Sequence, residues 1–221
     1  MYGNGSMFFS NVPFSNEKQK VMKNIYLPLI CVVFVISCKA QTISLTTPRY
    51  EASQGAYFKD LDNEMDKYVG TWQYPHGTDT LTIVLQKKIR VFDGEYYEDL
   101  LIGEYRYVHN GQEIINTLSL LNDIAIIGGE HNINGRNFIL NNEVLQCNDC
   151  SSSEKRIRLY FHDPERNYLS LSLVLRYLPQ SFGTPEKMTA ALIDNDSVML
   201  PDENSPTVPR VPYGEYLMVK Q

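Results

Sequence analysis

Apolar and polar side chains alternate with a period of two along most of the chain after Gly70. Because alternate side chains of a β-strand point to opposite faces, this pattern predicts strands with one buried face and one wetter face. The segment Tyr216–Gln221 alternates again and predicts a last strand. The clearest buried faces are Leu81, Ile83 and Leu85, then Ile157, Leu159 and Phe161, then Leu169, Leu171, Leu173 and Leu175.

Tight-turn signals separate these runs. Asp-Gly and Asn-Gly pairs tolerate the positive φ angles that two-residue hairpin turns require. The signals are His76-Gly77, Asp93-Gly94, Asn110-Gly111 and Asn134-Gly135, and the first three glycines recur every 17 residues. This spacing predicts an antiparallel up-and-down meander. A sheet of eight to ten such strands closes or folds on itself to remove its edges, so the predicted fold class is all-β, a barrel or a sandwich.

One short N-terminal helix is expected before the strands. Leu61, Met65 and Tyr68 stand at i, i+4 and i+7, which is one helical face. The acidic residues between them suggest a calcium loop, but Met65 occupies the position where such a loop needs glycine. We therefore expect a helix within Tyr57–Tyr68, and the proline-rich region Pro179–Pro212 is expected to be partly loop.

The most apolar run, Ile25–Ser37, has thirteen residues without a charge. A helix needs ~20 apolar residues to cross a bilayer, whereas a run of this length suits the apolar centre of a signal peptide. A buried strand is the less favoured interpretation, because strands are usually shorter. The resulting division is a leader outside the natural reading frame (1–21), a signal peptide (22–37), a tether (38–56) and one β domain (57–221).

The residues that end this run, Val35-Ile36-Ser37-Cys38, resemble the lipobox of bacterial lipoproteins. The resemblance implies cleavage before Cys38 and lipidation of Cys38, so that acyl chains anchor the protein to the membrane. Lys39 stands where an Asp would favour retention in the inner membrane. The expected location is therefore the bacterial cell envelope, with the outer membrane preferred.

Two further resemblances concern the folded part. Gly70-Thr71-Trp72 resembles the Gly-x-Trp opening of lipocalins, which implies that Trp72 closes one end of a ligand-binding barrel. A lone Gly-x-Trp is also compatible with Trp72 as an ordinary buried aromatic residue. A larger part of the sequence resembles an uncharacterised family of flavobacterial lipoproteins. This resemblance implies a cellular location but no known activity. Its segments are Lys67–Trp72, Gly94–Tyr105, Cys147–Cys150, Phe161–Pro164 and the Cys-Lys-Ala-Gln that starts at Cys38.

Charge and motifs narrow the function classes. The net charge is −6 and no long basic run occurs, so no nucleic-acid partner is expected. The sequence contains no zinc-protease helix motif, no Gly-x-Ser-x-Gly elbow, no P-loop and no dinucleotide fingerprint, so neither a catalytic site nor a cofactor is predicted.

Cys147-x-x-Cys150 is the one paired thiol motif in the β domain. A four-residue turn brings its end Cα atoms within about 7 Å, which is compatible with a disulfide, and an exported protein meets oxidising conditions. Free thiols are the second interpretation. A zinc site lacks ligands, since only His131 and His162 are candidates, and a redox site would need its first Cys at the start of a helix.

Together these features predict a lipid-anchored envelope protein whose barrel binds a small apolar or amphipathic ligand. The alternative is an interaction or scaffold protein of an envelope complex without an internal ligand. The two differ in the barrel interior, which would hold a cavity in the first case and side chains in the second.

Overall fold

The computed structural model describes residues 41–140, 143–178, 182–198 and 202–221. Among these residues, no helix is long and apolar enough to cross a membrane. The described part contains eleven strands and four 3-10 turns. The strands are β1 (Thr42–Ser44), β2 (Tyr57–Lys59), β3 (Gly70–His76), β4 (Asp79–Phe92), β5 (Tyr97–His109), β6 (Gln112–Asn116), β7 (Ile133–Ile139), β8 (Arg156–Phe161), β9 (Leu169–Leu178), β10 (Lys187–Val198) and β11 (Gly214–Lys220). The 3-10 turns are η1 (Arg49–Glu51), η2 (Asp66–Tyr68), η3 (Leu118–Asn122) and η4 (Gly128–Glu130).

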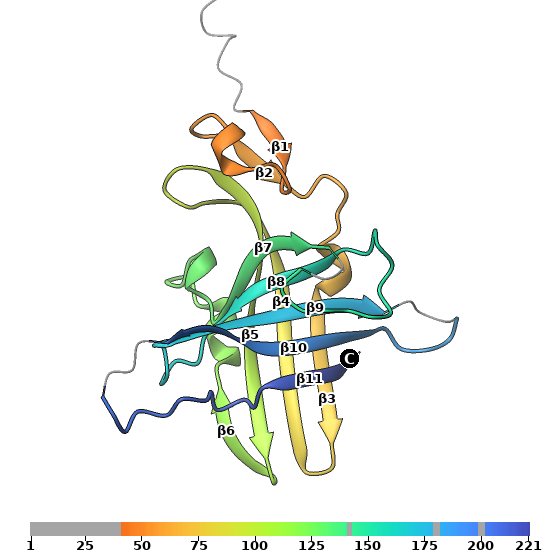
Figure 1. Ribbon diagram of the computed structural model, residues 1–221, viewed down its shortest axis with the longest axis vertical. Coiled ribbons are helices and arrows are strands. Elements are labelled where there is room, and N and C mark those ends of the chain that lie inside the picture. The colour runs from red at the N-terminus through yellow and green to blue at the C-terminus, as the bar shows by residue number, and fades with distance from the viewer. Residues whose placement is uncertain (1–40, 141–142, 179–181, 199–201) are drawn as a thin grey trace, which may run out of the picture. The chain divides into compact units, whose positions relative to one another are not determined.

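Eight strands close into one antiparallel barrel (Figure 1). Their order is β5-β4-β3-β11-β10-β9-β8-β7, and β7 pairs back to β5. The strands follow one another around the barrel in chain order, which confirms the predicted up-and-down meander and decides for a barrel of the lipocalin-like kind. At the seam between the first and last barrel strands, Lys220 of β11 pairs with Trp72 of β3.

Strand β5 uses its second edge for three different partners, while β4 occupies the first edge. It pairs with β2 at Tyr97 and Glu98, with β7 from Leu101 to Gly103, and with β6 from Arg106 to His109. A Cβ atom on Gly103 would lie 2.6 Å from a Leu85 methyl group and 2.7 Å from the Val84 carbonyl oxygen. Glycine is therefore needed where β4, β5 and β7 meet to close the barrel.

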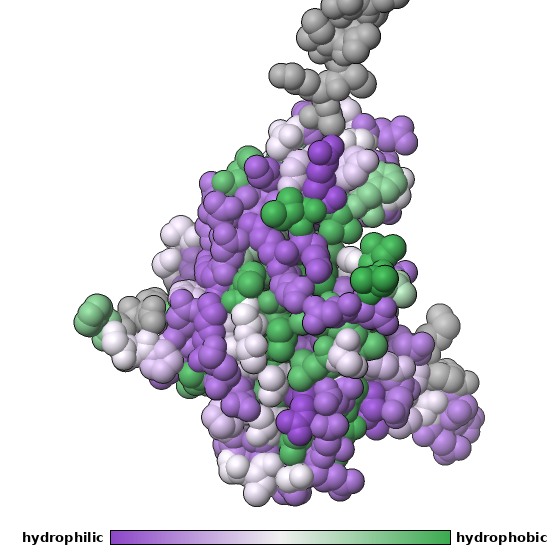
Figure 2. Space-filling view, turned by 180° about the vertical axis from the view of Figure 1, so that it is seen from behind, coloured by the Kyte–Doolittle hydropathy of each residue, from purple (hydrophilic) through white to green (hydrophobic). Residues whose placement is uncertain are grey.

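The alternation of apolar residues is confirmed by burial. Leu81, Ile83 and Leu85 of β4 are each at most 1% exposed, and the inward residues of β8 and β9 are buried in the same cluster. Burying one such side chain stabilises the fold by about 1.5–3 kcal/mol. On the face shown in Figure 2, hydrophobic residues form patches among hydrophilic ones.

Three of the four predicted turns are found between strands, and the fourth is not. Gly77, Gly94 and Gly111 have positive φ angles at the β3–β4, β4–β5 and β5–β6 connections. The prediction of a turn at Asn134-Gly135 is wrong, because both residues lie inside β7. The pairing of β7 with β8 shifts register between Asn134 and Asn137, so the glycine marks a bulge.

The predicted N-terminal helix is not formed. Tyr57–Lys59 is strand β2, and only the turn η2 follows. The physical reason is Asp60, whose buried carboxylate accepts the backbone N–H groups of Glu64 (2.9 Å) and Met65 (3.0 Å). Such side-chain acceptors compete with helical hydrogen bonds. Leu61, expected on the buried face, is 55% exposed.

Residues 41–56, expected as part of a tether, belong to the β domain. Strand β1 pairs in parallel with β2, and β2 pairs in parallel with β5, which joins this segment to the sheet. Leu45 and Ala56 are buried in the main hydrophobic cluster. Two buried side chains and strand pairing hold this segment to the barrel. So few apolar residues form no pattern in the sequence from which the packing could be predicted. The predictions for residues 1–40, including Cys38, lie outside the described residues.

Candidate functional site

The interior of the barrel is occupied by protein side chains. Trp72, Tyr105, Phe161 and Met188 are each at most 1% exposed and belong to one continuous cluster. The rings of Tyr105 and Phe161 lie 4.5 Å apart, centroid to centroid. The barrel interior is therefore filled by side chains and differs from the ligand-binding cavity that the lipocalin resemblance implied.

Trp72 is therefore part of this packing and does not line an open site. Its indole Nε1 donates a hydrogen bond to the Tyr68 carbonyl oxygen at 2.7 Å. The Lys220 ammonium lies 5.3 Å from the centre of its ring. A cation over an aromatic face adds about 0.5–2 kcal/mol, so the pair reinforces the β3–β11 seam.

A groove of about 880 Å³ opens beside the barrel wall. Ligand pockets commonly enclose about 300–1,000 Å³, so this volume suits a small molecule. Seven parts of the chain line it: the segment after β1, the end of β4, the start of β5, the region of η4, and the strands β7, β8 and β9. The lining residues are Leu45, Thr46, Thr47, Pro48, Arg49, Val91, Phe92, Asp93, Glu98, Leu100, Ile127, Gly129, Glu130, Asn134, Gly135, Arg136, Asn137, Phe138, Arg158, Leu159, Tyr160 and Ser172.

Large apolar side chains of the groove remain exposed. Phe92 is 53% exposed, Ile127 63% and Tyr160 62%. Leu159 also reaches the groove, although it is only 1% exposed. It does so beside Gly135, where a Cβ atom would lie 3.2 Å from the Leu159 Cα atom. Exposed apolar side chains around a concave site are typical of a binding surface.

One end of the groove is built by a chain of ion pairs. Arg49 contacts Asp93 at 2.7 Å and Glu98 at 2.9 Å, and Arg136 contacts the same Glu98 oxygen at 2.5 Å. Arg136 also donates to the Leu45 carbonyl oxygen at 3.0 Å. Two cations and two anions thus neutralise one another and fix the segment after β1 against β5 and β7.

The pKa of Asp93 is lowered within this chain. Burial alone would raise it, but the backbone N–H groups at the β4–β5 turn and the Arg49 guanidinium outweigh burial. The carboxylate therefore stays ionised to a lower pH than an ordinary aspartate, which preserves its bond to Arg49.

The neighbouring acid Asp99 has a structural role as well. It is 1% exposed and accepts the Tyr57 hydroxyl at 2.5 Å and the backbone N–H groups of Asp60 and Arg90 at 3.0 Å each. Burial and this acceptor raise the pKa of Tyr57. The adjacent acids Glu98 and Asp99 thus hold loops in place, because their oxygens are already occupied by protein donors.

A buried polar cluster on the outer wall had no signal in the sequence. Glu104 is fully buried and accepts from His131 Nδ1 at 3.0 Å and from the Asn132 side-chain amide at 2.7 Å. His131, considered above as a zinc candidate, is 2% exposed and bound to this carboxylate. The cluster secures the loop that carries η3 and η4, so it positions Ile127 and Glu130 at the groove.

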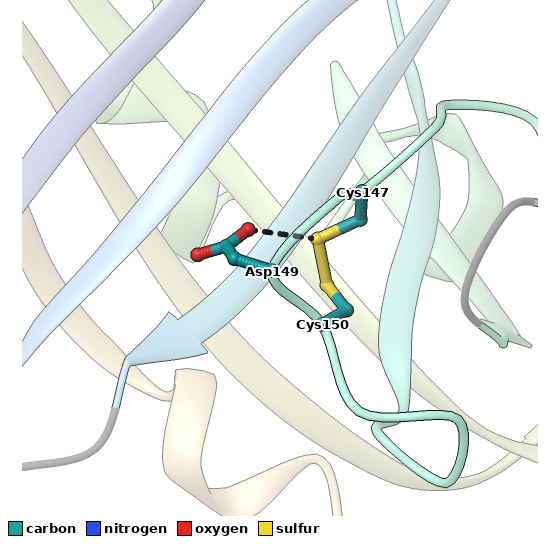
Figure 3. Close-up of side chains that lie close together, drawn as sticks. All are labelled: Cys147, Asp149 and Cys150. Carbon is teal, nitrogen blue, oxygen red and sulfur yellow. Dashed lines mark hydrogen bonds between the residues drawn. A yellow bond between two sulfur atoms is a disulfide. The ribbon is translucent and has the colours of Figure 1, made fainter.

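Cys147 and Cys150 form a disulfide with a Cα–Cα distance of 5.4 Å (Figure 3). The Asp149 carboxylate lies 3.5 Å from the Cys147 sulfur and is bound at 2.9 Å by Arg176. Cys147, Asp149 and Cys150 form the one group of potential metal ligands among the described residues. With both sulfurs bonded to each other no thiolate is available, so the group does not fit a zinc site. It also lies apart from the groove, which none of its members lines.

Residues 22–221 match a family of unknown function, DUF6705. The chain belongs to the DUF6705 family. No curated protein and no solved structure matches the sequence.

Proposed function

We propose that this DUF6705 protein is a binding protein that holds a small apolar or amphipathic molecule in the groove beside the barrel wall. The observation that carries the proposal is the groove itself, about 880 Å³ in volume, with Phe92, Ile127 and Tyr160 half-exposed around it. Covering these side chains with an alkyl chain removes apolar surface from water, at about 25 cal/mol per Å².

The ligand site of this proposal differs from the one that the lipocalin resemblance implied. The expected site was the barrel interior behind Trp72, and side chains occupy that space. The proposed site is instead the groove outside the barrel, where irregular segments next to β7 and β8 leave a space that no side chain fills. A rigid barrel with its site on adjoining loops is a common arrangement, since loops tolerate variation while the scaffold holds them.

The proposal includes a lipid anchor at Cys38 in the cell envelope, with the outer membrane preferred. The lipobox-like sequence before Cys38 supports it, and the family match begins at residue 22, the expected start of the signal peptide. Replacing Cys38 by Ser should move the protein from the membrane to the soluble fraction, because the acyl chains would be absent. Retention of Cys38→Ser protein in the membrane fraction would contradict the anchor.

The second candidate is an interaction or scaffold role. It is favoured by strand β1, which lies at the end of the sheet order, so that one of its edges pairs with no other strand among the described residues. Unpaired edges accept strands from partner proteins. Cross-linking through cysteines placed on β1 would capture a partner if this role holds.

Binding of dodecanol, a neutral twelve-carbon amphiphile, tests the groove. Ile127→Ser should weaken binding about tenfold, because it removes a large apolar contact. Ile124→Ser is the matched control: Ile124 is 98% exposed, comes from the same loop and does not line the groove. Equal binding of dodecanol by the two variants would refute the proposal, and so would failure of the unmodified protein to bind both dodecanol and the corresponding carboxylate.

A further inference from the structure

Arg158 of β8 differs from the other two arginines that line the groove. Arg49 and Arg136 both contact carboxylates. Among the described residues, no carboxylate forms an ion pair with Arg158, whose contacts are with neutral groups. A positive charge therefore faces the groove without an ion-paired carboxylate among the described residues.

The Arg158 guanidinium is held in one orientation by two neutral acceptors. Its Nε donates to the Ser172 hydroxyl at 2.9 Å and its Nη2 to the Asn195 amide oxygen at 2.8 Å. Ser172 is 1% exposed and donates to the same Asn195 oxygen at 2.9 Å. The three side chains thus form a closed triangle that fixes the arginine on the barrel wall.

This triangle occupies one edge of the guanidinium and leaves the other edge open. An arginine has five N–H groups in a planar fork, and the edge formed by Nε and Nη2 is used here. The edge formed by Nη1 and the second hydrogen of Nη2 makes no hydrogen bond to the described residues. Two parallel N–H groups of this kind match the two oxygens of a carboxylate.

The remaining acid of the groove, Glu130, forms no ion pair with Arg158. Glu130 is exposed, and its carboxylate accepts the Ile127 backbone N–H at 2.9 Å, which closes the η4 turn. Glu130 is therefore used locally, whereas Arg158 is half-buried, oriented and unpaired among the described residues. The acids and arginines that line the groove balance in number, three of each, so the complementarity with an anion is local to the open edge of Arg158.

We propose that Arg158 binds the head group of a single-chain carboxylate amphiphile, a ligand of the fatty-acid class, whose alkyl chain covers the apolar side chains of the groove. This proposal rests on the proposed binding function and names its ligand class. Tyr160 lies two residues from Arg158 on the same strand and is 62% exposed, so apolar surface begins directly beside the cation. The oriented fork adds a charge-assisted pair to that apolar contact.

The test compares dodecanoate with dodecanol at pH 8, on the unmodified protein, by calorimetric titration. We expect dodecanoate to bind at least about tenfold more tightly, the size typical of a charge-assisted pair. Arg158→Gln should abolish this preference while dodecanol still binds. Arg106→Gln, which removes an arginine outside the groove, should leave the preference unchanged.

Each other outcome overturns a different statement. Equal affinity of the unmodified protein for both compounds, or a preference that survives Arg158→Gln, would refute the role of Arg158 while the groove function stands. Failure of both compounds to bind would refute the groove function itself. If Arg158→Gln does not fold, Arg158→Lys decides: it keeps the charge but lacks the fork, so an undiminished preference would refute the two-pronged contact.

Discussion

Individual buried carboxylates in this protein tie irregular segments to the barrel. Asp163, after β8, is 1% exposed and accepts three hydrogen bonds from Arg210: from the backbone N–H at 2.8 Å, from Nε at 2.9 Å and from Nη2 at 2.6 Å. Arg210 lies before β11, so a single side chain fixes the connection from β10 to β11. The same guanidinium contacts Glu165 at 2.7 Å, but that carboxylate is 74% exposed.

Replacing Asp163 by Asn should lower the free energy of unfolding by about 3 kcal/mol, because it leaves the Arg210 charge without its buried partner. Urea unfolding at pH 7 measures the loss. Glu165→Gln is the matched control and should cost less than about 1 kcal/mol, since exposed ion pairs contribute little. Similar losses for the two variants would show that burial does not set the strength of this contact.

Among the elements, the connection between β7 and β8 is held to the barrel by arginines. Arg156 donates to the carbonyl oxygens of Leu140, Glu143 and Leu145. Arg176 of β9 contacts Glu154 at 2.6 Å. The hydrogen bond from Arg176 is the largest cause of the lowered pKa of Glu154. This connection is therefore fixed to β8 and β9 by charge as well as by packing.

The lowered pKa of Glu154 predicts how the free energy of unfolding changes as the pH falls. A carboxyl whose pKa is lowered by folding stabilises the fold above its usual value of 4.5, and this contribution is lost as pH falls through the folded pKa. Arg176→Gln should therefore cost about 1 kcal/mol at pH 7 and flatten the decline below pH ~4.5. Urea midpoints between pH 3 and pH 7 measure this.

Arg166→Gln serves as the control for that series. Arg166 donates to the Val208 carbonyl oxygen and forms no ion pair with a carboxylate among the described residues. Its loss removes the same formal charge without touching Glu154. An acid limb that flattens equally in both variants would assign the effect to net charge rather than to the Arg176 pair.

The whole described domain, Gln41–Gln221, is one compact unit. Trp72 is the only tryptophan of the chain and is fully buried in the core. Its fluorescence therefore reports the core packing next to the β3–β11 seam, while far-ultraviolet circular dichroism reports every strand. We expect the two signals to change at the same urea concentration, since a barrel with one core unfolds cooperatively. An earlier fluorescence change would show that the seam opens before the other strands.

The sequence was informative where the signal is local. Alternation at Leu81, Ile83 and Leu85 depends only on strand geometry, so the strands and their inward faces were predictable. The helix at residues 57–68 was predicted wrongly because one side chain, Asp60, redirects the backbone there. The groove was not predictable, because seven separate parts of the chain build it. Arg158 has no local mark that distinguishes it from other strand arginines, since its missing counter-charge is a property of the assembled wall.

The seam between β3 and β11 also bears on how the protein reaches its native state. Trp72 and Lys220 pair across the seam although almost the whole domain separates them along the chain. Contacts of such long sequence separation form slowly, and β proteins that depend on them fold in milliseconds to seconds. During synthesis β3 leaves the ribosome long before β11 exists, so one edge of the growing sheet stays open throughout. Such an edge is prone to pair with other chains and to cause aggregation. Pairing of β11 with β3 covers this edge and so removes the risk.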